Sequence, residues 1–317
     1  MRDVRLDLLR IIGIIAVVCI HTFCALDYAV YPQYRTVGLV LNTLCHYAVP
    51  LFVMVSGIVF MDRCDGPLAA FYWKRLTRIA FPLVPCVVFF LLLRILRDGD
   101  SVTLALTETV MGRPYYHLWF AFMLLGVSLF LPLIVRLVEE VNNLTLLIVG
   151  SLAVYVAWRG GEGPYQIVPY AAYAMIGMII FRRYGNGTHQ LEGLLALILC
   201  ATLSVVNARL VLRTGSLWMI GYSSPFILVG ASSLMIAYLS LLPRFISTHI
   251  VRLAGLTFAV YLWHPVFKGA TMALVLHVPW LRGQAWLSFP LTCLFAFSAT
   301  FCLSFFRMST WIGVGKR

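Results

Sequence analysis

The sequence predicts an all-α protein of the polytopic membrane class, a bundle of about ten transmembrane helices. Apolar residues make up 62% of the 317 residues and charged residues 11%, with a mean hydropathy of +0.92. A soluble domain would carry about a quarter charged residues to cover its surface. The apolar residues also gather in windows of about 20, which is the length that crosses a bilayer. Both observations point to the same class.

Ten candidate spans follow one another along the chain, over residues 7–26, 37–61, 79–97, 115–138, 144–159, 166–183, 191–212, 221–242, 251–276 and 286–307. Several are short or interrupted by a proline (Pro50, Pro82, Pro85, Pro132 or Pro225), so nine or eleven spans also fit. The connections are brief, and none is long enough for a separate soluble domain. We therefore expect residues 1–317 to form a single transmembrane domain.

The basic residues predict the orientation. If the N-terminus is cytoplasmic, fourteen lie in inner segments: Arg2, Arg5, Arg63, Lys74, Arg75, Arg78, Arg136, Arg182, Arg183, Arg244, Arg252, Arg307, Lys316 and Arg317. Eight lie in outer segments: Arg35, Arg94, Arg97, Arg113, Arg159, Arg209, Arg213 and Arg282. The positive-inside rule then places both termini in the cytoplasm. The net charge of +12 is scattered among apolar spans, which favours contact with lipid headgroups and argues against nucleic-acid binding.

The first span carries three ionisable side chains on one stripe. Eleven helical steps bring His21 to within about 20° of Arg10 and roughly 16 Å further along the axis, and Asp7 lies one turn before Arg10. Ionisable groups are costly in a bilayer and mark candidate functional sites. A simpler interpretation makes Arg10 a headgroup contact paired with Asp7 and His21 a packing residue. The run lacks a cleavage site, which favours a retained anchor over a signal peptide.

Other chemistry-bearing groups lie further along. Lys74, Arg75 and Arg78 follow the second span in an inner loop, where guanidinium groups three apart suit phosphate oxygens. A positive-inside anchor with an aromatic belt is the alternative.

Ser56 and Gly57 permit close helix contact after Pro50. His117 and Trp119 open the fourth span, and His264 lies deep in the ninth, while nothing places His46. The eight cysteines have no metal-ligand or disulfide spacing, so no metal is expected.

On these residues the chain resembles the membrane-bound acyltransferase family 3, whose members acylate sugars of bacterial surface glycans and related molecules. The resemblance rests on five motifs: Arg10 with His21, Val49-Pro-Leu-Phe with Ser56-Gly57, Arg75-Leu-Thr-Arg78 with Ile79 and Pro82, His117-Leu-Trp-Phe, and Tyr261-Leu-Trp-His264. Their order and spacing cover nearly the whole chain. The extra span and esterase-like domain of some members are missing, so a stand-alone enzyme is expected.

The resemblance implies a membrane O-acyltransferase in the bacterial cytoplasmic (inner) membrane. It would move an acyl group, most often acetyl, from cytosolic acyl-CoA such as acetyl-CoA to a hydroxyl of a glycan or lipid-linked saccharide. His21 would be the general base, with an acyl-imidazole as the other route. Arg10, fixed by Asp7, would orient the donor. The donor phosphates would bind Arg75 and Arg78, with Lys74 beside them.

The remaining motif residues would line the acceptor pocket: Ser56, His117, Trp119 and His264. A rival from another class is a proton-coupled transporter or polysaccharide exporter, which also needs intramembrane His and Arg around broken helices. Two observations argue against a transporter. No inverted repeat is detected in the sequence, and the paired basic residues of one inner loop have a more specific use in binding CoA. A third alternative is a structural scaffold in a glycan-assembly complex.

Overall fold

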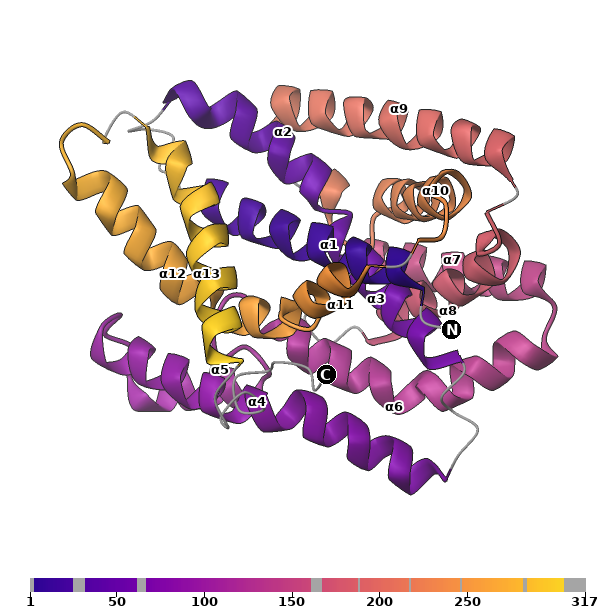
Figure 1. Ribbon diagram of the computed structural model, residues 1–317, viewed down its shortest axis with the longest axis horizontal. Helices are drawn as coiled ribbons and strands as arrows, with labels where there is room; N and C mark the ends of the chain where they lie inside the picture. The colour runs from indigo at the N-terminus through magenta and orange to yellow at the C-terminus, as the bar shows by residue number, and fades with distance from the viewer. Residues whose placement is uncertain are drawn as a thin grey trace.

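The computed structural model describes residues 3–24, 32–61, 67–160, 167–187, 189–216, 218–245, 247–281 and 284–304. The described residues form helices and no strand. In chain order the helices (Figure 1) are α1 (Val4–Phe23), η1 (Pro32–Tyr34), α2 (Arg35–Cys45), α3 (Ala48–Phe60), α4 (Leu68–Leu96), α5 (Val102–Val110), α6 (Trp119–Glu140), α7 (Asn143–Gly160), α8 (Ile167–Tyr184), α9 (Gln190–Thr214), η3 (Trp218–Ile220), α10 (Pro225–Leu241), α11 (Thr248–Ala254), α12 (Thr257–His277), η4 (Ala285–Leu287) and α13 (Ser288–Leu303).

Within the described residues, nine helices are long and apolar enough to cross a membrane, with α2 and α3 together forming one of them. This confirms an all-α, multi-pass membrane protein. The one predicted span missing from these nine is the sixth, 166–183. It is also a helix, α8, but it ends in Arg182 and Arg183 and is therefore less apolar. Six of the basic residues used for the orientation lie outside the described residues: Arg2, Arg63, Arg282, Arg307, Lys316 and Arg317.

Three predicted spans differ clearly from the helices, two by an internal break and one by its starting residue, and a proline explains only one of these differences. The second span is broken into α2 and α3 at residues 46–47, because Pro50 has no N–H for the carbonyl of His46 and its ring crowds that position. Pro82, Pro85 and Pro132 instead lie inside continuous helices. The ninth span is broken between α11 and α12, and α4 begins at Leu68, eleven residues before the predicted span.

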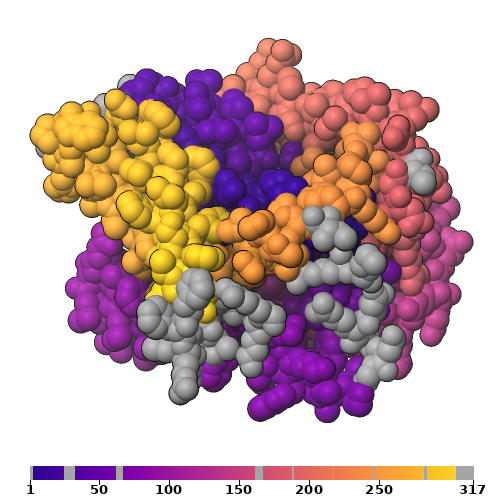
Figure 2. Space-filling view, viewed as in Figure 1, coloured from indigo at the N-terminus to yellow at the C-terminus, as the bar shows by residue number. Residues whose placement is uncertain are grey.

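The first helix lies at the centre of the bundle. It contacts α2, α3, α11, α12 and α13, and Figure 2 shows its indigo atoms only in the depth between the orange and yellow segments of that face. Its N-terminal end and that of α4 lie on the same side in Figure 1. A side chain on α1 therefore faces several neighbouring helices at once, which is where a membrane protein can hold polar groups.

A close contact joins α3 to α8. A Cβ added at Gly57 would lie 2.5 Å from the Ala174 carbonyl oxygen, and one at Gly177 would lie 2.6 Å from Cβ of Met54. The two backbones thus approach as closely as membrane helices do through small residues. The close contact expected at Gly57 is confirmed, and its partner is α8.

A buried arginine joins the start of α1 to the ends of two other helices. Arg5 is inaccessible to solvent, and its guanidinium donates to the carbonyls of Gly185 (2.5 Å), Leu239 (2.8 Å) and Leu242 (3.1 Å). Asp3 pairs with the same guanidinium at 2.7 Å. Gly185 follows α8, and the other two carbonyls lie at the end of α10. A cation is favourable where helix carbonyls are left unpaired.

We expect Gly57→Ala to destabilise the protein, since the new methyl group must displace the α8 backbone. Overpacking of this kind costs about 1–3 kcal/mol, measured as a lower midpoint of thermal unfolding in detergent. Gly269→Ala is the matched control, because a Cβ at Gly269 meets nothing within 4 Å. Equal midpoints for the two variants would contradict the close α3–α8 contact.

We expect Arg5→Met to cost about 3–5 kcal/mol of unfolding free energy, because it leaves Asp3 and several carbonyls without their buried partner. Chemical unfolding in detergent measures the loss. Arg183→Met is the control: Arg183 pairs with Glu192 at 3.3 Å, but its side chain is 61% exposed, and water screens such a pair so that its loss has little effect on stability. An Arg5 variant as stable as the control would refute the role given to the guanidinium.

Candidate active site

Three histidines from distant parts of the chain meet at one place. The ring of His264, on α12, stacks on the ring of His21, on α1, with centroids 5.3 Å apart. The ring of His117, in the turn before α6, meets His264 edge to face at 5.2 Å. The sequence predicted each of these as a site residue, and the fold brings them together. We call His21, His117 and His264 the histidine cluster.

His21 is held by ring contacts. Tyr116 meets it edge to face at 4.9 Å, and His264 stacks on it. The ring is half-buried, and no hydrogen bond joins it to any described residue. His21 also lies two residues before the end of α1 at Phe23, so it is close to one end of the helix, whereas the predicted span of 7–26 placed it deeper. Its nitrogens are therefore available to a substrate.

The other two imidazoles have fixed hydrogen positions. Nδ1 of His264 lies 2.8 Å from the Tyr261 carbonyl, and Nε2 of His117 lies 3.1 Å from the Leu262 carbonyl. Because a carbonyl only accepts, these two nitrogens carry the hydrogens. Pro265 explains the first bond, since it lacks the N–H that would otherwise bond the carbonyl of Tyr261.

The remaining nitrogens of these two rings, Nε2 of His264 and Nδ1 of His117, are buried and have no partner in the described structure. Burial, with smaller effects from His264 and His21, holds the pKa of His117, which precedes the α6 span, well below its ordinary value. A neutral ring with one donated hydrogen leaves the second nitrogen as an acceptor. Both sites thus need a donor, and a hydroxyl group is one.

Tyr261 connects the elements of the cluster. Its hydroxyl donates to the His117 carbonyl at 2.5 Å and accepts from the Ala121 N–H at 3.2 Å. The tyrosine on α12 therefore fixes the turn that carries His117 and the start of α6. The motif Tyr-Leu-Trp-His was recognised in the sequence, but the structural role of its tyrosine was not.

Sequence reasoning also missed Lys268. It lies one turn after His264 in α12, and its ammonium nitrogen is 4.7 Å from the ring centroid of Tyr116. Tyr116 contacts His21 on the same ring. A lysine inside an apolar span was a usable signal, because intramembrane cations are rare. Its partners could not be read from the local sequence.

Asp7 and Arg10 lie at the opposite end of α1. Nη1 of Arg10 is 3.2 Å from Oδ1 of Asp7, whose side chain is almost inaccessible, while that of Arg10 is 25% exposed. This confirms the predicted pairing. Eleven helical steps separate Arg10 from His21, so the two side chains face separate environments.

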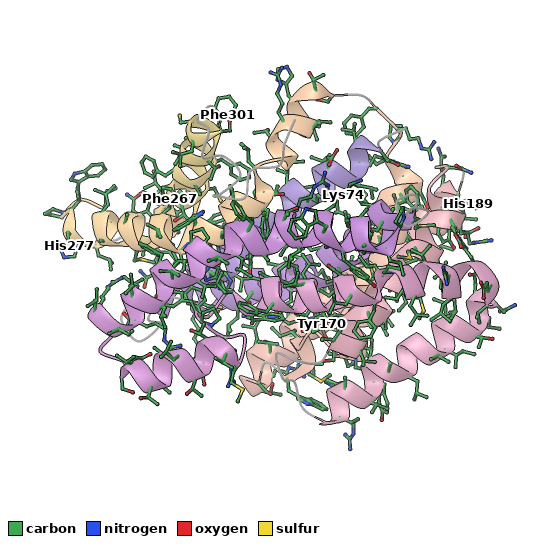
Figure 3. All side chains as sticks on the ribbon, turned by 90° about the horizontal axis from the view of Figure 1, so that it is seen from below. Lys74, Tyr170, His189, Phe267, His277 and Phe301 are labelled. Atoms are coloured by element: carbon green, nitrogen blue, oxygen red, sulfur yellow. The ribbon has the colours of Figure 1, made fainter. Side chains whose placement is uncertain are left out.

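The basic residues expected to bind the donor lie on a helix and not in a loop. Lys74, Arg75 and Arg78 all belong to the first turns of α4, and Figure 3 shows Lys74 on this helix at the surface of the molecule. Lys74 and Arg78 are exposed. Arg75 turns toward α6: its Nε donates to the Ser128 hydroxyl at 2.7 Å, and its guanidinium lies 4.3 Å from the Phe60 ring centroid. The three cations therefore differ in environment.

Trp119 belongs to a second aromatic group beside the histidine cluster. Its ring lies 5.6 Å from Tyr222 and 6.0 Å from Tyr170, and Tyr222 stacks on His46 at 5.1 Å. His46 is thus placed at the break between α2 and α3, where Nδ1 bonds the Asn42 carbonyl at 2.7 Å. Among the described residues, Ser56 bonds within its own helix, to the Phe52 carbonyl at 2.8 Å.

Two other features bear on the kind of site. No group of three or more His, Cys, Asp or Glu residues with metal-binding geometry occurs among the described residues. An apolar groove of about 530 Å³ lies between α12 and α13, lined by residues such as Phe267, Leu274 and Phe295. None of its lining residues is a histidine or carries a charge, so the candidate active site is the histidine cluster.

The fold and this cluster define a multi-pass membrane protein with buried imidazoles at a junction of helices from three parts of the chain. A family model described as an acyltransferase domain, Acyl_transf_3, matches residues 3–306. The chain therefore belongs to the acyltransferase 3 family and is a membrane acyltransferase. No curated protein and no solved structure matches it.

The hydrogen-bond geometry predicts opposite tautomers for the two buried histidines. We expect His264 to carry hydrogen on Nδ1 and His117 on Nε2, which ring ¹⁵N NMR of the purified protein distinguishes. Exchange of Pro265 for Ala should weaken the Nδ1 bond, because the restored N–H competes for the Tyr261 carbonyl. Observing the same tautomer on both rings would refute the assignment.

Proposed function

We propose that this protein is an O-acyltransferase that moves an acyl group, most often acetyl, from cytosolic acyl-CoA to a hydroxyl of a glycan or lipid-linked saccharide. The family match supports acyl transfer. The observation that carries the finer proposal is the arrangement around His21: an accessible imidazole beside two buried nitrogens that can only accept a hydrogen bond. Such a site suits an alcohol, whose O–H is a donor.

His21 is the general base of the proposed reaction. It takes the proton of the acceptor hydroxyl, and the hydroxyl oxygen attacks the carbonyl carbon of the thioester. The C–S bond then breaks, and the CoA thiolate takes the proton from the His21 imidazolium, which gives an ester and free CoA. A covalent acyl group on His21 is the alternative route. Nε2 of His264 and Nδ1 of His117 hold further acceptor hydroxyls.

The donor binds at the opposite end of α1. Arg78 and Lys74 are exposed on the first turns of α4, where cations reach the phosphates of CoA. Arg75 is oriented by Ser128 and Phe60, so its guanidinium is held in place. Arg10, fixed by Asp7, orients the donor arm. We place this end of α1 on the cytoplasmic side of a bacterial inner membrane, as the count of basic residues suggests. No metal takes part in the proposed reaction.

Two substitutions separate the proposed roles. We expect His21→Ala to abolish acyl transfer and keep donor binding, since the base is lost and the cations of α4 remain. We expect Arg75→Ala with Arg78→Ala to lose donor binding, because the phosphates lose their partners. Thermal stabilisation of the detergent-solubilised protein by acetyl-CoA measures binding. Mass spectrometry of surface glycans, from a deletion strain carrying each variant, measures transfer as about one acetyl mass per repeat.

His277→Ala is the control for His21, because His277 is exposed and marks the end of the molecule opposite His189 in Figure 3. This variant should retain both binding and transfer. Wild-type glycan acetylation by the His21 variant would refute the mechanism. A wild-type protein that no acyl-CoA stabilises would favour the transporter interpretation. Loss of the whole glycan in the deletion strain would support a scaffold.

A further inference from the structure

Lys268 places a cation beside the histidine cluster, inside a membrane-spanning helix. Its ammonium nitrogen lies over the ring of Tyr116 at 4.7 Å, and the same ring contacts His21 at 4.9 Å. Lys268 is partly buried, and no carboxylate of the described residues forms an ion pair with it. A cation held at this depth needs an anionic partner.

The groups around His21 differ in what they can donate. Nδ1–H of His264 and Nε2–H of His117 are taken by backbone carbonyls, and their free nitrogens only accept. The Tyr261 hydroxyl donates to the His117 carbonyl. These three groups therefore cannot stabilise a negative charge. Lys268 has three N–H donors and a positive charge, and no hydrogen bond from them to a described residue is observed.

Acyl transfer creates a negative charge that these acceptors cannot stabilise. When a hydroxyl oxygen attacks a thioester, the carbonyl oxygen becomes an oxyanion until the C–S bond breaks. Donors aimed at this oxygen in a water-poor site give one of the largest contributions to catalysis. The two nearby imidazole acceptors would instead repel it.

We propose that Lys268 is a catalytic residue that donates hydrogen bonds to this oxyanion, a role that rests on the proposed function. The hydroxyl proton goes to His21, the new C–O bond forms, and the carbonyl electron pair moves onto oxygen beside the ammonium group. When that pair returns, the C–S bond breaks and the thiolate takes the proton from His21. Lys268 keeps its own protons throughout. Tyr116 positions the ammonium group through its ring.

The experiment measures CoA release by purified protein, with acetyl-CoA as donor and glycan extracted from the deletion strain as acceptor. Lys268→Met removes the charge and keeps most of the length of the unbranched side chain. We expect its kcat to fall about 10²–10³-fold, with thermal stabilisation by acetyl-CoA unchanged. Lys268→Arg, which keeps the charge, should recover part of the loss. Arg209→Met removes an exposed cation from α9 and should retain wild-type kcat.

A second pair of variants tests the contact with Tyr116. Tyr116→Phe keeps the ring and removes the hydroxyl, so it should retain most of the activity. Tyr116→Ala removes the ring, and its kcat should fall toward that of Lys268→Met. If Tyr116→Phe loses as much activity as Tyr116→Ala, the tyrosine hydroxyl would be the group that stabilises the oxyanion, and the proposal would be overturned.

Three further outcomes would also overturn it. The first is a Lys268→Met kcat within about twofold of wild type, in an enzyme that is otherwise active. The second is a rise in KM for the glycan alone, which would make Lys268 an acceptor-binding group. The third is an equal loss in Asp27→Asn, a residue outside the described ranges, which would make Lys268 a structural ion partner. A wild-type protein that transfers no acyl group would instead refute the proposed function itself.

Discussion

The buried guanidinium of Arg5 is the interaction on which the position of the first helix depends. It bonds carbonyls at the ends of α8 and α10, and the Arg5 carbonyl accepts a further hydrogen bond from the Tyr238 hydroxyl of α10 at 2.7 Å. An apolar helix between apolar neighbours has little to fix its height, because dispersion contacts change slowly along the axis. A charged group with several directional bonds does fix it. Since α1 is one rigid helix, Arg5 also sets the height of His21 at the other end.

The histidine cluster is arranged by backbone carbonyls. Because Pro265 has no N–H, the Tyr261 carbonyl lacks its helical partner and accepts from Nδ1 of His264 instead. The Tyr261 hydroxyl donates to the His117 carbonyl and so fixes the turn that carries His117. In each of these two imidazoles, the N–H donates to a backbone carbonyl, and the other nitrogen, an acceptor, has no partner among the described residues. Unpaired buried acceptors cost free energy. That cost is recovered when a ligand supplies the donors, which favours hydroxyl-bearing substrates over apolar ones.

Hydropathy was enough to predict the spans, because crossing a bilayer is a property of local composition. It also identified His21 and His264 as costly residues, whereas His117 was included only as part of a motif of the family resemblance. It could not show that they meet, since the contacts join α1, α12 and the turn before α6. Arg5 was used only in the positive-inside count, because a sequence does not distinguish an arginine at the lipid headgroups from a buried arginine that bonds several helix ends. The contacts of Lys268 with Tyr116 and of Arg75 with Ser128 could not be predicted, because the partners are far away in sequence.

The two ends of α1 restrict the donor that the proposed function can use. A donor held near Arg10 and the first turns of α4 must reach the histidine cluster, roughly 16 Å further along the helix. A compact donor, such as an acyl phosphate, is too short to touch both ends at once. A phosphate-bearing head with a long, thin arm that ends in a thioester does so, and acyl-CoA has this form. Under the proposed function, the separation of Arg10 and His21 on the rigid helix α1 therefore favours a long donor such as acyl-CoA.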